Sequence, residues 1–342
     1  MPADGSSRPY LNRSRRVPTP SNHTGRSFKS PSSQISFSDE LKALLQGQKK
    51  SWKILADGYV SLASVRHREL SCRGFDVTLQ YNPGRMTSTA APVDEQSISD
   101  RSCFLCVENL PKEQEGLLYS EDFIFLCNPA PIFAQHFTIS HLSHRPQALE
   151  PFLSQFFSLA KDLSPAFSVF YNGPRCGASA PDHMHFQASP AGLIPVEREM
   201  QSSRREAVVF VNRTEISTLK DFGRETIILE GTDPEQIGNT LLRLLGVFRD
   251  VAGTAEEPMV NIICTFRAPQ WRVILFPRKK HRPDAFFRKD KRRILVSPAA
   301  VDMGGLIITP SEIDFNRLDG KMIETIYSEV SLDSGRALEA LW

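Results

Sequence analysis

The sequence predicts an α+β protein of two halves, each with an antiparallel sheet and packed helices. Two observations indicate this class. Short apolar runs, several of them alternating with polar residues, recur between turn residues, as strands do. Two longer stretches, 149–162 and 234–252, are typical of helices. With 342 residues, 40% of them hydrophobic, the chain can bury the core of one large or two medium domains.

The first half is expected to begin with a helix. Apolar residues recur at helical spacing from Leu41 to Leu55, and Ser36 or Ser38 can cap the start. From Phe75 the pattern FDVTLQYNPGRMTST alternates and then turns at Asn82-Pro83-Gly84, so a strand leads into a loop that carries Arg85. Further elements are expected as strands at 123–127, 136–140, 167–171 and 183–188 and a helix near 149–162.

The second half repeats strands beside one helix. The helix at 234–252 has Thr232 or Asp233 as its cap and Pro234 at its first position. Strands are expected near 206–211 and, as a pair, at 260–266 and 272–278. The predicted domains are a disordered tail at 1–36, a catalytic half with a zinc site at 37–200, and a second half at 201–342.

The composition limits the binding partners and the cellular location that can be expected. Lys and Arg number 41 against 39 for Asp and Glu, so no bulk charge indicates nucleic acid or an anionic membrane. No apolar run is long enough to cross a bilayer, which favours a soluble, cytoplasmic protein with a small-molecule partner. Residues 1–36 are rich in Ser, Pro and Arg. They also fit an organelle transit peptide, although their prolines disfavour its amphipathic helix.

The most informative stretch is YNGPRCGASAPDHMHFQASP at 171–190. Side chains two apart on a strand point to the same side, so His183, His185 and Gln187 are expected to share one face. His185 can attack phosphorus if its other ring nitrogen is held by an acceptor, and Gln187 can donate an amide N–H to the phosphoryl group. The alternative is that this His-x-His is a structural pair or a metal site.

Smaller residues in the same stretch suit a phosphate ligand. Gly177 permits close approach of the backbone, and Ser179 with nearby amides can donate to phosphate oxygens.

A second set of residues has metal-ligand spacing. Cys103 and Cys106 form Cys-x-x-Cys, and the histidines that follow stand at 136, 141, 144 and 183. Two cysteines and two histidines can complete a closed, structural zinc site. The alternative is a redox-active or incidental cysteine pair.

The segment from Asn172-Gly173 through Gly177-Ala178-Ser179 to His183-Met184-His185-Phe186-Gln187 resembles the active-site strand of the histidine-triad superfamily. The resemblance is to its transferase branch, which includes galactose-1-phosphate uridylyltransferase, diadenosine tetraphosphate phosphorylase and GDP-hexose phosphorylases. The hydrolase branch typically has a third histidine where this chain has Gln187. Asp182 is a departure, because several relatives run proline directly into histidine.

The resemblance implies two histidine-triad-like halves and assigns further residues. It selects His144 and His183 as the zinc ligands beside Cys103 and Cys106, which leaves His136 and His141 as exposed or packing residues. It places Asn172 at the substrate. The loop with Arg85 resembles one that borders the nucleotide, where a guanidinium can grip phosphate, although a lone arginine after a turn is usually solvated.

Residues 259–283 resemble a strand pair of the phosphorylase members. Arg278, with Lys279, Lys280 and Arg282, is expected to bind phosphate, and a solvated basic loop is the alternative reading of the lysines. No chemical role is assigned to the stretch 296–310, which contains Gly304 and Gly305.

The predicted function is a nucleotidyltransferase or phosphorylase acting on a nucleoside diphosphate sugar or dinucleoside polyphosphate through a nucleotidyl-histidine at His185. Phosphate or a sugar phosphate is the acceptor. The alternatives are a nucleotide hydrolase of the histidine-triad type and a non-catalytic, zinc-stabilised nucleotide-binding protein. A homodimer is compatible with the sequence.

Overall fold

The structure is a computed structural model that describes residues 28–32, 35–200, 202 and 204–333. The strands of the large sheet are, in chain order, β3 (Gly116–Tyr119), β4 (Phe123–Cys127), β5 (Phe137–His141), β6 (Phe167–Asn172), β7 (His185–Pro190), β8 (Arg205–Val211), β9 (Thr214–Leu219), β10 (Ile227–Gly231), β11 (Val260–Arg267) and β12 (Gln270–Pro277). A smaller sheet contains β1 (Arg66–Ser71), β2 (Asp76–Tyr81) and β13 (Leu306–Thr309).

Helices surround both sheets. They are α1 (Phe37–Ser51), α2 (Lys53–Ala63), α3 (Met86–Thr89), α4 (Glu95–Ser99), α5 (Leu153–Asp162), α6 (Val196–Glu199), α7 (Pro234–Ala252), α8 (Asp284–Phe287), α9 (Ala300–Met303), α10 (Glu312–Arg317) and α11 (Gly320–Val330). Short 3₁₀ turns are η1 (Pro83–Arg85), η2 (Val107–Asn109) and η3 (Glu150–Phe152). Among the residues described, no helix is both long and apolar enough to cross a membrane.

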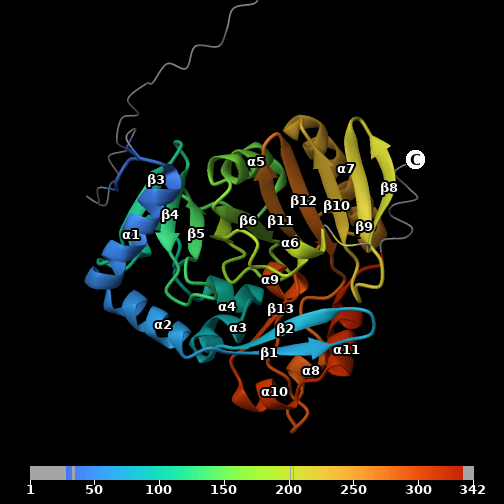
Figure 1. Cartoon of the computed structure of the whole chain (residues 1–342). Coiled ribbons are helices and arrows are strands. Elements are labelled where there is room, and N and C mark those ends of the chain that lie inside the picture. The colour runs from blue at the N-terminus through green and yellow to red at the C-terminus, as the bar shows by residue number, and fades with distance from the viewer. Residues whose placement is uncertain (1–27, 33–34, 201, 203, 334–342) are drawn as a thin grey trace, which may run out of the picture.

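One ten-stranded antiparallel sheet runs through both halves of the chain (Figure 1). Its strand order is β3-β4-β5-β7-β6-β11-β12-β10-β9-β8. The joint is the pairing of β6 with β11, in which Asn172 lies opposite Asn261 and Val169 opposite Cys264. The α+β class, the antiparallel sheets and the packed helices are confirmed, and the sheets of the two halves are continuous with each other.

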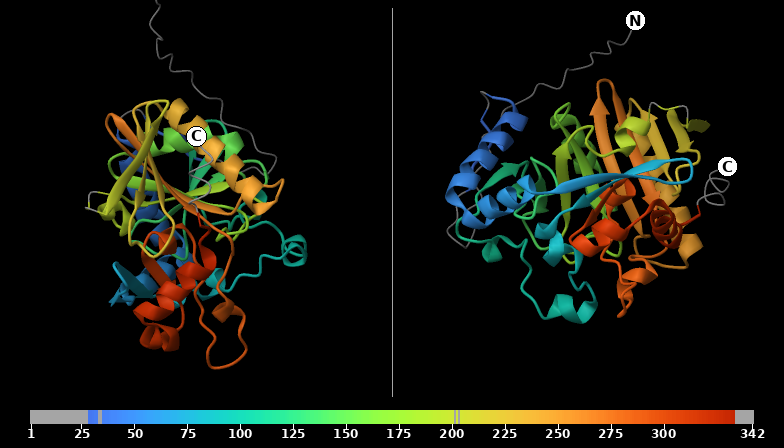
Figure 2. Two further views of the ribbon diagram at one scale, coloured as in Figure 1. Left: turned by 90° about the vertical axis from the view of Figure 1, so that its right-hand side faces the viewer. Right: turned by 60° about the horizontal axis from the view of Figure 1, so that its bottom comes forward.

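The large sheet is buried on both faces where the halves meet. Tyr171 and Ile262 pack into one core with residues of α1, α5 and α7, while their neighbours Phe170 and Ile263 pack into another. This second core also contains residues of β1, β2, β13 and α11. The molecule therefore has three layers, with the small sheet and the C-terminal helices on the opposite side from α5 and α7 (Figure 2).

The small sheet joins strands from the first and the second half of the chain. Strand β13 pairs in parallel with β2, so that Leu306 lies opposite Thr78 and Thr309 opposite Tyr81. The domain boundary predicted at residue 200 stays a prediction. The strand pairing nevertheless shows that the second half returns to pack against the first.

Local signals in the sequence set several boundaries. The Ser36 side chain accepts from the Asp39 amide and caps α1, and Asp233 caps α7 with Pro234 in its first turn. Within the predicted tail at 1–36, two residues contact the large sheet. Phe28 is buried, and the Lys29 carbonyl accepts from the Leu118 amide of β3, while residues 1–27, 33 and 34 fall outside the described residues.

Helix α2 packs so closely against the β4–β5 loop that position 58 requires a glycine. A Cβ on Gly58 would lie 2.0 Å from the Pro129 carbonyl oxygen, whereas a Cβ on Gly246, in α7, would have no neighbour within 4 Å. Pro129 belongs to the β4–β5 loop, which forms part of the cavity described below.

We expect Gly58→Ala to destabilise the protein, because the added methyl group collides with backbone and forces α2 away from the β4–β5 loop. Gly246→Ala is the matched control, which should be neutral or stabilising by up to about 1 kcal/mol, because alanine favours the helix. Thermal unfolding measures both. Equal melting temperatures for the two variants would contradict the packing described here.

Candidate active site

A cavity of about 710 Å³ lies between the two halves. The first half provides the η1–α3 segment, the β4–β5 loop and the ends of β6 and β7. The second half completes the wall with Arg282, a predicted phosphate ligand, and with residues to which the sequence assigned no chemistry, namely His281, Ser297, Ala299, Val301, Asp302 and Ile308. A cavity of this volume suits a ligand of nucleotide size. The candidate site therefore belongs to both halves and not to the first alone.

His185 stands at the start of β7 and lines this cavity. Its Nδ1 lies 2.8 Å from the carbonyl oxygen of His183. A carbonyl only accepts, so the proton of the neutral ring is on Nδ1 and the Nε2 lone pair is free. Burial lowers the pKa of His185 to about 4, which keeps the ring neutral near pH 7.

Gln147 holds the strand ends around His185. Its amide nitrogen donates to the carbonyls of Asn172 (2.9 Å) and His185 (3.0 Å), and its oxygen accepts from the His185 amide (2.8 Å). The side chain is buried and continues the β6–β7 ladder where the strands diverge. No role was assigned to Gln147 from the sequence, because that role depends on contacts between segments that are distant in the chain.

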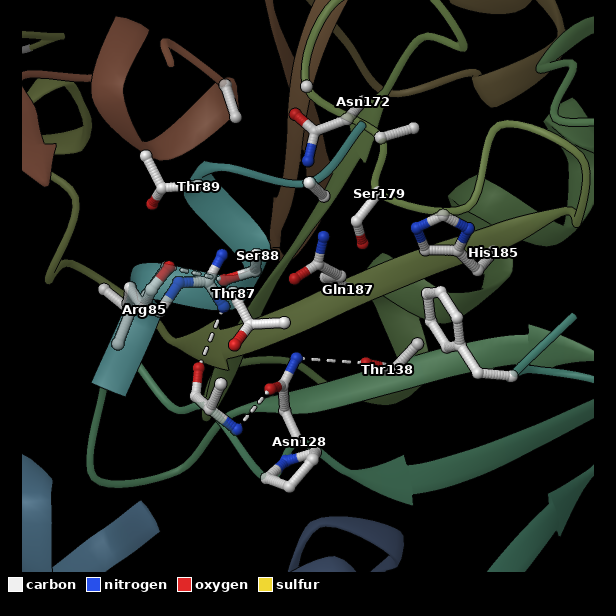
Figure 3. Close-up of a pocket in the computed structure, with 18 of the residues that line it drawn as sticks. Arg85, Thr87, Ser88, Thr89, Asn128, Thr138, Asn172, Ser179, His185 and Gln187 are labelled. Atoms are coloured by element: carbon white, nitrogen blue, oxygen red, sulfur yellow. Dashed lines mark hydrogen bonds between the residues drawn. The ribbon is translucent and has the colours of Figure 1, made fainter. Parts of the chain in front are cut away.

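Three predicted substrate residues, Asn172, Ser179 and Gln187, line the cavity with His185 (Figure 3). The Asn172 Oδ1 accepts from Asn261 Nδ2 (2.9 Å) and from the Ala300 amide (2.8 Å). Its amide nitrogen is directed toward Ser179 and Gln187. The structure therefore brings hydrogen-bond donors together beside the free nitrogen of His185.

His136 is a site residue that sequence reasoning missed. It was expected to be exposed or to serve in packing, yet its buried ring lies behind Gln187, with Nε2 2.8 Å from Gln187 Oε1. His141 is a packing residue as expected, with its ring against Phe123 and Phe152. Only the pairing of β5 with β7, which places Thr138 opposite Gln187, brings His136 near.

Arg85 reaches the cavity across from His185, with Gln187 between them (Figure 3). Its Nη1 donates to the Ala130 carbonyl (2.9 Å), and its buried Nε has no hydrogen-bond partner among the described residues. Burial lowers the pKa of Arg85 to about 10, and the Asp302 carboxylate opposes that shift. A half-buried arginine whose buried Nε is an unused donor suits an anionic ligand.

Asp302 is the carboxylate of the second-half wall. Its oxygens accept from the amides of Ala299 (3.0 Å) and Ile308 (2.9 Å), and burial raises its pKa to about 6. The side chain thus fixes the loop that closes the cavity.

Asp182, the departure in the histidine motif, has a partner. Its carboxylate lies 2.7 Å from an Nη2 of Arg101, which also lines the cavity. The strand register is undisturbed, since Ser140 still lies opposite His185. Asp182 offsets the charge of Arg101, whereas Arg282 forms no ion pair with a described residue and adds positive charge to the cavity. No motif in the sequence pointed to Arg101.

The placement of Arg278 corrects a sequence prediction. It does not line the cavity, and its buried guanidinium donates to Asn261 Oδ1 and to the carbonyls of Val330, Pro298, Lys280 and His281. All five N–H groups are used within the protein, so none is left for phosphate. Arg278 instead ties the 298–300 segment to Asn261, and through it to Asn172. The neighbouring Lys280 pairs with Asp284 on the exposed side.

Gly177 lines the cavity with φ +111°. A Cβ there would lie 2.6 Å from the Cβ of Ala299. Glycine is therefore required by the approach of the second half, whereas the sequence analysis attributed it to the approach of a ligand.

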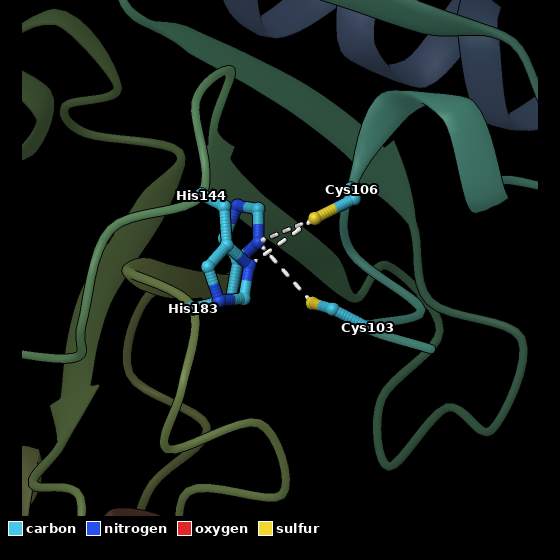
Figure 4. Close-up of side chains that lie close together, drawn as sticks. All are labelled: Cys103, Cys106, His144 and His183. Atoms are coloured by element: carbon cyan, nitrogen blue, oxygen red, sulfur yellow. Dashed lines mark hydrogen bonds between the residues drawn. The ribbon is translucent and has the colours of Figure 1, made fainter. Parts of the chain in front are cut away.

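The predicted metal ligands lie close together in a cluster separate from the cavity-lining face of His185 (Figure 4). The ligand atoms of Cys103, Cys106, His144 and His183 all lie within 4.8 Å of one another. His183 Nδ1 is 3.3 Å from Cys103 Sγ, and His144 Nδ1 is 3.2 Å from Cys106 Sγ. Neighbouring ligands of a tetrahedral zinc ion are separated by about 3.5 Å for a sulfur and a nitrogen. The cluster can therefore hold a metal ion.

His183 is prepared as a ligand but does not share the face of His185. Its Nε2 lies 2.8 Å from the His141 carbonyl, so the proton is on Nε2 and Nδ1 offers its lone pair to the cluster. Strand β7 begins only at His185, and the ring of His183 points to the cluster while His185 and Gln187 line the cavity. The expectation of three polar side chains on one strand face is wrong for His183.

Two family models match adjacent parts of the chain. Residues 44–190 match a domain of unknown function (DUF4922), and residues 197–338 match a GDPGP1-like C-terminal domain. Yeast Ap4A phosphorylase Apa2 in complex with Ap4A has a similar structure, with a TM-score of 0.60 and 14% identity over 86% of this chain and 97% of that one. The chain therefore shares the fold of this phosphorylase.

A second structure of the same yeast phosphorylase agrees on the fold. Apa2 without a named ligand gives a TM-score of 0.57 at 14% identity, covering 90% of this chain and 99% of that one. A GalT-like protein from Arabidopsis thaliana gives a TM-score of 0.36 at 13% identity, covering 77% of this chain and 99% of that one, and supports no argument by itself. Among curated proteins, none matches the chain.

Proposed function

We propose that the chain is a nucleotidyltransferase or phosphorylase that acts on a nucleoside diphosphate sugar or a dinucleoside polyphosphate through a nucleotidyl-histidine at His185. The observation that carries the proposal is the hydrogen bond from His185 Nδ1 to the His183 carbonyl, which leaves Nε2 free in the cavity. The GDPGP1-like match and the fold shared with an Ap4A phosphorylase support the substrate class.

In the first step His185 Nε2 attacks the α-phosphorus of the nucleotide. A bond forms between Nε2 and phosphorus, and the bond from phosphorus to the bridging oxygen breaks, so that oxygen leaves with its electron pair on a sugar phosphate or nucleotide. The ring becomes cationic as Nε2 gives up its lone pair. The His183 carbonyl, already bound to the Nδ1 proton, stabilises that charge.

In the second step the acceptor reverses the chemistry. An oxygen of phosphate or of a sugar phosphate attacks the same phosphorus, and the bond to Nε2 breaks with its electrons returning to the ring. Donors from Gln187, Ser179 and Asn172 meet the phosphoryl oxygens in both steps. The positive charge of Arg85 and Arg282 favours a polyanionic substrate and a phosphate acceptor.

We also propose that the Cys103, Cys106, His144 and His183 cluster holds a structural zinc ion. Four protein ligands complete a tetrahedral site, so no position stays open for substrate. The metal would fix the residue whose carbonyl holds His185. Its contribution is to positioning, and no bond is made or broken at it. Cytoplasmic location and a homodimer stay predictions.

The covalent intermediate is the direct test. The protein is incubated without acceptor with ATP, GDP-sugars, UDP-sugars and dinucleoside polyphosphates, and intact mass is recorded. A mass increase of one nucleotide with one or more of these donors is expected. No adduct and no turnover with any donor would overturn the proposed function.

Replacing the nucleophile should stop the reaction while keeping the fold. His185→Gly removes the attacking nitrogen, so turnover should fall by about four orders of magnitude or more, while the fold and the metal content are kept. Free imidazole that enters the vacated space should restore part of the activity. Full turnover by His185→Gly would exclude this mechanism.

Gln187 should decide between transfer and hydrolysis. An amide can hold the phosphoryl oxygens but cannot supply the protonated imidazole that helps a poor leaving group depart, so the wild-type adduct should persist until an acceptor is added. In Gln187→His we expect faster loss of the adduct to water and a lower ratio of transfer to hydrolysis. Steady release of mononucleotide by the wild type, unaffected by any acceptor, would instead identify a hydrolase.

Metal content should follow the cluster. One zinc ion per chain is expected, and Cys103→Ser should lower both zinc content and melting temperature, because a structural metal contributes folding free energy. Cys72→Ser is the matched control, since this half-buried cysteine lies outside the cluster and its loss should leave the zinc content unchanged. Full activity and unchanged melting in metal-free protein would contradict the zinc proposal.

A further inference from the structure

The role given to Gln187 depends on which end of its amide faces the substrate. Only the nitrogen end can donate to a phosphoryl oxygen, and the oxygen end would repel it. Rotation of the amide group by half a turn exchanges the two ends. Something in the protein must therefore select one orientation, because an amide free to turn would spend part of its time in the repulsive one.

The contacts of His136 select the orientation of the Gln187 amide. His136 Nδ1 accepts from the main-chain amide of Ile132 (3.3 Å), and an amide can only donate, so Nδ1 carries no proton. The proton of the neutral ring is then on Nε2, which lies 2.8 Å from Gln187 Oε1 and donates to it. With its oxygen engaged, Gln187 presents its nitrogen on the side of Ser179 (Figure 3).

The surroundings keep the ring in this state. His136 is fully buried, and burial together with the charge of Arg85 lowers its pKa to about 3. A second proton would have to sit on Nδ1, against the Ile132 N–H. The ring is also fixed between Phe133 and Phe170, and its main-chain amide donates to the Tyr59 hydroxyl (3.3 Å).

We propose that His136 is a positioning residue that holds the Gln187 amide with its N–H groups toward the phosphoryl oxygens. The inference rests on the proposed function, because Gln187 is assigned there to the transferred phosphoryl group. His136 itself does not line the cavity and touches no substrate. It acts through one hydrogen bond, so its effect should depend on the presence of Gln187.

The test is a double-mutant cycle on the rate of transfer to inorganic phosphate, with Ap4A and GDP-glucose as donors. His136→Leu should lower kcat about 10- to 100-fold with KM changed by less than about 3-fold, since the lost donor acts mainly on the transition state. His136→Gln, which can still donate from a similar position, should recover most of that loss. In a Gln187→Ala background, His136→Leu should change kcat by less than about 2-fold.

Tyr59→Phe is the matched control. It removes the partner of the His136 main-chain amide but leaves the contact between the ring and Gln187, so kcat should stay within about 2-fold of the wild type. Loss of activity in Tyr59→Phe equal to that in His136→Leu would overturn the inference. It would show that the β4–β5 loop, and not the imidazole, determines the rate.

A measurement on the wild type does not depend on any variant folding. Nitrogen NMR of histidine-labelled protein should show the His136 ring neutral and protonated at Nε2, with His136→Gln assigning the signal. A ring protonated at Nδ1 would overturn the inference. The inference would also be overturned if the losses of kcat caused by His136→Leu and Gln187→Ala were additive in the double variant. Wild-type protein that forms no adduct and transfers nothing would overturn the proposed function, and this inference with it.

Discussion

The hydrogen bond between His185 Nδ1 and the His183 carbonyl is the interaction on which the site depends. This hydrogen bond keeps the proton on Nδ1 and leaves Nε2 of His185 free. It can form only because the His183 backbone is held in place. The ring of the same residue points the other way, to two cysteines and His144, and is itself oriented by the His141 carbonyl. One residue thus links the Cys/His cluster to the proposed nucleophile, and the proposed metal would take no part in bond making or breaking.

The continuous sheet provides the rest of the site. Because β6 pairs with β11, Asn172 meets Asn261, and Arg278 extends that contact to the segment at 298–300. These contacts place loops of the second half opposite His185, where they complete the wall of the cavity. A change in the core of either half should therefore affect a site that chemically belongs mostly to the first.

Features with a local cause could be predicted from the sequence. Apolar runs located β4 and the β11–β12 pair, and capping residues located α1 and α7. Cys-x-x-Cys located half of the Cys/His cluster, and the family resemblance selected its two histidines. Features set by distant contacts could not be predicted. Arg278 has the composition of a phosphate ligand, but its acceptors come from segments before, beside and after it in the chain. His136 looked unremarkable because its partner is 51 residues away.

The position of the phosphorus–nitrogen bond tests the central claim most directly. A nucleotide adduct formed on protein with nitrogen-labelled histidine can be examined by phosphorus–nitrogen coupling, with His185→Gly as the blank. The geometry predicts a single adduct on His185 in which phosphorus is bonded to Nε2, while Nδ1 keeps its proton and its bond to the His183 carbonyl. An adduct bonded through Nδ1, or carried by another residue, would contradict the account.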